Sequence, residues 1–265
     1  MLARSLRLGA LLLLVAPWMP APVAAQARQG FEGMWSDPPA TPDGAFCDGF
    51  CTDVGLARLK ALLDDPANDA RSYTELAMEA DNYQRQQYLR PKLSAAALES
   101  YPLRVETDPG YLRCQPWGLA RQMVARHQLE IRRRGDQLDM RYGEWDAKRT
   151  VYLDGRRRPA NQPPSLMGHS VGRFDGQTLV IETTGLAPDR TPWQAEHSDQ
   201  LRVVERYTRS QDGNLLTLTA TFEDPATLTE PLVLKKVWTW APKAEIAPYK
   251  DCKPPAEPIS TGGRR

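Results

Sequence analysis

The sequence predicts a mainly β protein: a single antiparallel β-barrel of about nine strands with a helical insert near its N-terminus. From about residue 128 onward, apolar and polar residues alternate, which is the period of a half-buried strand. Asp175-Gly176 and Asp212-Gly213 each separate two such segments, as in tight hairpins. The 23 prolines and 18 glycines also favour turns over a helical bundle. A meander of this length tends to close, because closure removes exposed edge strands.

The expected strands account for most of the C-terminal half. They are a short segment at Trp35, 129–131 and 138–140 about a Gly135-Asp136 turn, 150–153, 171–174 and 178–183, 201–208 and 215–222, and 232–240. In the strand that ends at Glu223, threonines alternate with apolar residues. The threonine face either lines a polar pocket with Glu223 at its rim or faces solvent, and solvent is the commoner arrangement.

The helical insert is predicted over residues 52–100. Asp53 can cap a helix that Pro66 ends, and its apolar residues recur every three to four positions: Leu56, Leu59, Leu62 and Leu63. A second helix is expected from about 72 to 89, and residues 95–98 can form one further short turn of helix. No repeat divides residues 28–265, so we expect one domain.

Residues 1–27 are predicted to be a signal peptide. Arg4 and Arg7 precede an apolar stretch over residues 8–15, and small residues follow at 21–27. The apolar stretch is too short to span a bilayer, and no later segment is long enough. We therefore expect an exported protein, periplasmic or secreted, with no membrane span.

The charge balance argues against polyanionic partners. The chain has 34 basic and 33 acidic residues, and removing the two leader arginines leaves 32 against 33. The runs 132–134 and 156–158 are basic, but each lies at a strand end or turn with acids nearby. We expect no nucleic-acid partner, and the sequence does not indicate an oligomeric state.

Four cysteines, Cys47, Cys51, Cys114 and Cys252, allow three disulfide pairings, which the sequence alone does not separate. An oxidising compartment favours disulfides. The short loop between Cys47 and Cys51 suits a local bridge, which would leave Cys114 for Cys252. A zinc site is the alternative, but neither Cys114 nor Cys252 has a second ligand close by. We expect no metal.

Two sets of residues resemble known families. Gly33-Met34-Trp35 resembles the G-x-W segment that opens lipocalin and related calycin barrels, in which the tryptophan plugs one end. Residues 149–156, 168–180 and 223–225 resemble a largely uncharacterised family of bacterial exported proteins, over about residues 114–231. The resemblance implies a calycin-like barrel and no established catalytic residues. The helical insert departs from a minimal lipocalin.

One predicted hairpin suggests acid–base chemistry. A two-residue loop at Asp175-Gly176 would set His169 opposite Glu182, with Arg173 on the same face. A carboxylate orients an imidazole as general base or acid, and Arg173 would stabilise a developing anion. A three-residue loop would instead set His169 opposite Ile181 and dissolve the pair. A His–Glu pair on a sheet is also more often a structural contact.

Other residues are candidates for a ligand site. Trp193 and His197 lie in a proline-containing loop that suits a lid, although Ser198 and Asp199 can simply end that loop. Trp145 and further tryptophans can line an apolar cavity or form the core. We assign His197, Trp193, Trp145 and Glu223 to ligand binding. No G-x-S-x-G, H-E-x-x-H or G-x-G-x-x-G motif is present, so no cofactor is expected.

These observations support two hypotheses. The first is an exported barrel that binds a small, partly apolar molecule. The second is a cofactor-independent acid–base enzyme, a lyase, isomerase or hydrolase, that uses His169 and Glu182. An envelope interaction module that uses the helical insert is a third class. The fold does not choose among them, because function depends on the site.

Overall fold

The structure is a computed structural model that describes residues 30–99, 101–102, 108, 112, 114–247 and 252–253. The predicted signal peptide lies outside these residues. None of the helices in the described ranges has the length and apolar character needed to cross a membrane.

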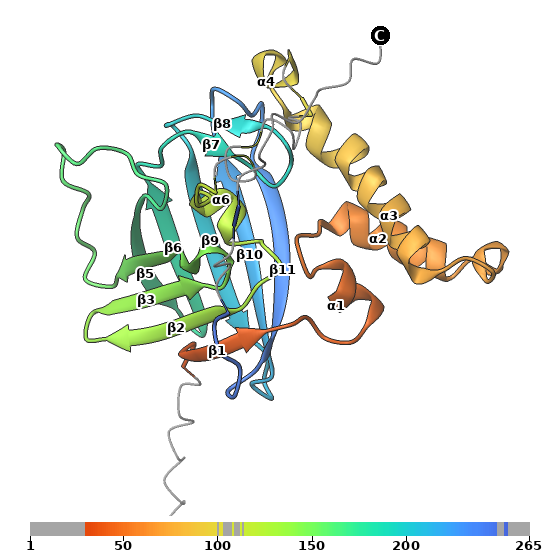
Figure 1. Ribbon diagram of the computed structural model, residues 1–265, viewed down its shortest axis with the longest axis horizontal. Coiled ribbons are helices and arrows are strands. Elements are labelled where there is room, and N and C mark those ends of the chain that lie inside the picture. Colours follow the sequence, from red (N-terminus) through yellow and green to blue (C-terminus); the bar gives the residue numbers. More distant parts are fainter. Residues whose placement is uncertain are drawn as a thin grey trace, which may run out of the picture. The chain divides into compact units, whose positions relative to one another are not determined.

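Nine strands form a closed barrel in the order β1-β11-β10-β9-β6-β5-β4-β3-β2, which confirms the predicted fold class (Figure 1). β1 closes the barrel because it pairs with both β2 and β11. The barrel strands are β1 (Gly33–Ser36), β2 (Leu129–Arg134), β3 (Gln137–Tyr142), β4 (Lys148–Tyr152), β5 (His169–Asp175), β6 (Thr178–Thr184), β9 (Arg202–Arg209), β10 (Leu215–Glu223) and β11 (Leu232–Trp240). β7 (Asp189–Arg190) and β8 (Glu196–His197) form a separate two-stranded sheet.

The barrel is mixed, whereas the sequence predicted antiparallel pairing throughout. β4 and β5 run parallel, with Val151 opposite Ser170 and Tyr152 opposite Val171. A tight turn can only reverse the chain, but β4 and β5 are joined by residues 153–168. This long connection returns the chain to the end of the barrel where β4 began.

The barrel interior is packed with side chains. In β10, Leu216, Leu218 and Phe222 are fully buried, while the intervening threonines are half-buried on the outside. The threonine face is therefore the solvated one, as the sequence favoured. Fully buried side chains from β2, β3, β6, β9 and β11 complete this core.

One ion pair lies inside this apolar core. Arg149 donates to both carboxylate oxygens of Glu205, at 2.7 Å to Oε1, and the Tyr207 hydroxyl donates to Glu205 at 2.9 Å. Both members of the pair are almost completely buried. Burial raises the pKa of the Tyr142 and Tyr207 hydroxyls, so both remain protonated.

Strands β2 and β11 both pair with β1 at Trp35. This side chain is fully buried, and its Nε1 donates to the Phe31 carbonyl at 3.0 Å. The Arg209 guanidinium lies 5.0 Å from the Trp35 ring, and Trp240 packs edge-on against the same ring. Elsewhere in the barrel, the short helix α6 (Leu119–Gln122) contributes Leu119 to the core.

The helical insert follows its predicted course, with differences at its ends. Thr52, not Asp53, caps α2, because the Thr52 side chain accepts from Gly55 N. Ser72 and Glu75 form a capping box at the start of α3. The elements are α1 (Pro42–Phe46), α2 (Asp53–Leu63), η1 (Pro66–Asn68), α3 (Tyr73–Gln84), the π-helical turn η2 (Arg85–Leu89), η3 (Arg90–Lys92) and α4 (Ala95–Glu99).

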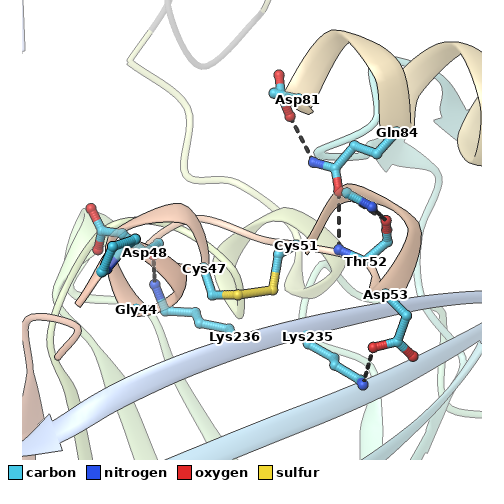
Figure 2. The surroundings of a disulfide bond; sticks show 12 residues. Gly44, Cys47, Asp48, Cys51, Thr52, Asp53, Asp81, Gln84, Lys235 and Lys236 are labelled. Carbon is cyan, nitrogen blue, oxygen red and sulfur yellow. Dashed lines mark hydrogen bonds and ion pairs between the residues drawn. A yellow bond between two sulfur atoms is a disulfide. The ribbon is translucent and has the colours of Figure 1, made fainter. Parts of the chain in front are cut away.

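The Cys47–Cys51 disulfide and strand β11 hold the start of the insert. Both suggested pairs are present, Cys47–Cys51 and Cys114–Cys252. Cys51 also exchanges two backbone hydrogen bonds with Lys235 of β11, at 2.9 and 2.8 Å. Figure 2 shows the first disulfide between α1 and α2, directly over β11. The chain at the start of the insert is thus hydrogen-bonded to β11, the last strand of the barrel.

We predict that Glu205→Gln destabilises the protein by about 3–5 kcal/mol, because Arg149 is left as an unpaired buried charge. Urea unfolding measures this loss. Replacing both members, Arg149→Met with Glu205→Leu, is expected to recover most of it. Glu223→Gln removes one partner of the half-exposed Arg202 and is the control, with a cost below about 1 kcal/mol. Equal losses in both single variants would contradict the prediction.

Candidate functional site

A groove of about 740 Å³ separates the helical insert from the segment that contains α6. It is open to solvent and lies outside the barrel interior. α3 forms one wall, α1 and the loop after it form the base, and α6 with the turn after it forms the other wall. The main lining residues are Phe46, Phe50, Tyr73, Ala77, Met78, Asp81, Arg85, Trp117, Arg121, Ala125, Arg126, His127 and Glu144.

Aromatic rings and guanidinium groups alternate along the groove. The Arg121 guanidinium lies 3.7 Å from the centre of the Trp117 ring, and Arg85 lies 5.2 Å from that of Phe50. Met78 is 62% exposed, which is unusual for a large apolar side chain on a helix. The groove therefore offers flat apolar surface together with fixed cations, a combination that suits a small, partly apolar molecule.

A histidine and a carboxylate meet in the wall of this groove. His127 Nε2 contacts Glu144 Oε2. The Glu144 side chain is 11% exposed, whereas that of His127 is 38% exposed. A buried carboxylate thus orients a half-exposed imidazole that lines the groove.

The turn that carries Glu144 has an unusual backbone. Trp145 and Asp146 both adopt left-handed conformations, with φ of 59° and 54°, although neither is glycine. Arg141 and Lys148 bind the Asp146 carboxylate and hold this conformation. A Cβ atom at position 143 would lie only 3.1 Å from His127 Cβ. Glycine at this position therefore permits the close approach of the Glu144 turn to the segment that contains His127.

Strand β11 binds the backbone of two groove-lining segments, one at Asp48 and one at residues 125–127. The Lys236 amine donates to the carbonyls of Asp48 and Ala125, the latter at 2.6 Å, and Trp238 Nε1 donates to the His127 carbonyl at 3.2 Å. Figure 2 shows Lys236 rising from β11 towards Asp48. Both lining segments, at Gly49 and at Ala125, are therefore fixed to one strand.

The predicted pairing of His169 with Glu182 is wrong. Asp175 pairs with Thr178, so the loop residues are Gly176 and Gln177, and His169 lies opposite Thr184. A loop shifted by one residue moves every cross-strand partner.

The predicted catalytic residues accordingly have partners other than one another. His169 contacts the Arg156 carbonyl at 3.1 Å, while the Glu182 carboxylate accepts from Arg202 at 2.9 and 2.8 Å. Arg173 lies opposite Val180 and is exposed. None of the three predicted residues lines the groove.

The four predicted ligand-binding residues are also dispersed. His197 is buried and contacts the Ser198 carbonyl at 2.8 Å, and Trp193 is buried against Phe222. Glu223 accepts from Arg202 on the outside of the barrel. Trp145 alone among the four contacts a groove-lining residue in an edge-on ring contact, at 6.2 Å from Trp117.

Sequence reasoning missed His127 and Glu144, although a signal for them exists. β2 and β3 pair about Gly135-Asp136 with Leu129 opposite Tyr142. Extending the same register two residues beyond that pair sets His127 opposite Glu144.

No three His, Cys, Asp or Glu side chains within the described ranges gather as they would around a metal ion. Comparison with protein-family models and with curated proteins finds no match for this chain. The resemblance to calycin barrels and to the bacterial exported family therefore stays a prediction.

The burial of Lys236 predicts a dependence of stability on pH. Burial lowers the pKa of Lys236 from 10.5 to about 7, despite the opposing effect of the nearby Asp48 carboxylate, and Arg126 lowers it further. Between about pH 7 and 10.5 the unfolded chain binds the additional proton, so folding becomes more favourable as the pH rises. Below pH 7 both states are protonated, and the cost of the buried charge is constant.

Lys236→Met is expected to lack this dependence. The unfolding free energy of the wild type should rise relative to that of the variant by about 1.4 kcal/mol per pH unit from pH 7 to 9.5. Guanidinium unfolding at half-unit pH steps measures it. Parallel profiles for the two proteins would show that the Lys236 amine titrates normally.

Proposed function

We propose that this protein is exported and binds a small, partly apolar molecule in the groove between its helical insert and its barrel. The main observation that supports this proposal is the groove itself. Its volume, about 740 Å³, lies within the range of small-molecule sites, and its lining combines rings with positioned charges.

The packed barrel interior favours the groove over the lumen. Glu205, Tyr207 and Leu218 are among the many inward-facing side chains with no exposed surface. A calycin-like carrier that held its ligand in the lumen would need space among these residues. In this chain the insert supplies the binding surface instead.

The leader and the disulfides support export. A basic segment, an apolar stretch and small residues open the sequence in the order of a signal peptide. Two disulfides form among the described residues, and disulfides persist in oxidising compartments. We place the protein in the periplasm or outside the cell.

The groove predicts a specific pattern of ligand loss. Met78→Glu places a carboxylate on the exposed α3 wall and should weaken binding of 1-anilinonaphthalene-8-sulfonate about tenfold or more, through charge repulsion and lost apolar contact. Trp117→Ala should act in the same direction. Fluorescence titration measures both, and native mass spectrometry of the wild-type protein from the periplasm identifies any natural ligand.

Leu63→Glu is the matched control. Leu63 is also an exposed apolar residue of the insert, 38% exposed at the end of α2, and it does not line the groove. Its variant should bind the probe as the wild type does. If Met78→Glu and Leu63→Glu bind equally well, the probe site lies elsewhere and the groove is not the ligand site.

A further inference from the structure

We propose that His127 and Glu144 form an acid–base pair that hydrolyses an ester held by its apolar group in the groove. This inference rests on the proposed binding function, since it assumes that the groove holds a small, partly apolar molecule. His127 would touch the substrate and the attacking water. Glu144 would act as a positioning residue through His127.

Only one of the two imidazole nitrogens of His127 contacts the Glu144 carboxylate. His127 contacts Glu144 through Nε2, and within the described part of the chain Nδ1 has no partner. The side chain is 38% exposed and lines the groove, so water and a bound molecule can both reach it. A carboxylate in this position fixes the ring and stabilises the imidazolium that forms when the ring accepts a proton.

The surrounding backbone is built to hold Glu144. Two consecutive non-glycine residues, Trp145 and Asp146, keep left-handed conformations, each of which costs free energy. Gln122 Nε2 donates to the Glu144 carbonyl at 2.7 Å and secures the start of this turn. Such strain concentrates at sites where position matters for function.

The groove also contains cations for the charge that ester hydrolysis develops. Arg121 lies against the Trp117 ring, and Arg126 directly precedes His127, its side chain 73% exposed. Both line the groove. A guanidinium group can stabilise a carbonyl oxygen that becomes an oxyanion. Because the groove is open to solvent, a reaction that consumes water suits it better than carbanion chemistry, which needs a site that excludes water.

The proposed step balances with water as the only co-reactant. His127 accepts a proton from water while the water oxygen bonds to the ester carbonyl carbon, and the carbonyl π electrons move to oxygen. The tetrahedral intermediate then collapses, and the bond from the carbonyl carbon to the alkoxy oxygen breaks. That oxygen takes the proton from the imidazolium, so one carboxylic acid and one alcohol result.

The test uses 2-naphthyl acetate, whose product 2-naphthol is fluorescent. His127→Gln should lower kcat about 100-fold, within the usual contribution of a general base. Glu144→Gln should lower kcat about tenfold and leave KM unchanged, a split that a merely structural role would not produce. Asp69→Asn makes the same change of charge at an exposed position and should keep the wild-type rate. Circular dichroism confirms that each variant is folded.

Each contrary result has its own meaning. A wild-type protein that binds the probe but hydrolyses the ester no faster than buffer overturns the acid–base pair and leaves the binding function standing. Full activity in folded His127→Gln overturns the pair as well. A wild-type protein that binds no probe and hydrolyses no ester removes the binding function together with the inference that rests on it.

Discussion

The attachment of the insert to β11 is the constraint on which the site depends. β11 pairs with β1 and β10 in the barrel. Lys235 continues its hydrogen bonding to Cys51, and the buried Lys236 side chain binds the carbonyls of Asp48 and Ala125. The two walls of the groove come from segments far apart in sequence. The base, at Asp48, and the wall that contains Ala125 share a position because the same strand binds both, and rigid support is what a binding site requires.

The packing of the barrel explains why the groove lies beside the insert and not inside the barrel. The barrel interior encloses the Arg149–Glu205 pair in an apolar core, and such a pair is tolerable only when its hydrogen bonds are largely satisfied. Among the described residues, this interior is filled by buried side chains. The groove lies instead where the insert adds a second surface, and we propose that binding takes place there, because function depends on the site rather than on the fold.

Local signals in the sequence were enough for the barrel strands and the helices of the insert, and the short loop between Cys47 and Cys51 suggested the first disulfide. Alternation and turn residues act over a few positions, and they determined these elements. The parallel pairing of β4 with β5 depends on the path of residues 153–168, about which local patterns say nothing. The predicted cross-strand pair was wrong for a narrower reason: moving the turn from Asp175-Gly176 to Gly176-Gln177 sets His169 opposite Thr184 in place of Glu182. Arg149 and Glu205 met across the barrel, beyond the reach of any local rule.

The closure of the barrel by β1 has a consequence for the order of folding. Trp35 pairs with Leu129 on one side and with Trp240 on the other, so the earliest strand cannot be completed until the latest one has been synthesised. Contacts this distant in sequence slow folding, because a long loop must close before they contribute any stability. In a nascent chain, one edge of β1 can pair with β2 early, but the other edge stays open until β11 has been synthesised. Such delayed closure suits a polypeptide that crosses a membrane unfolded and assembles only on the far side.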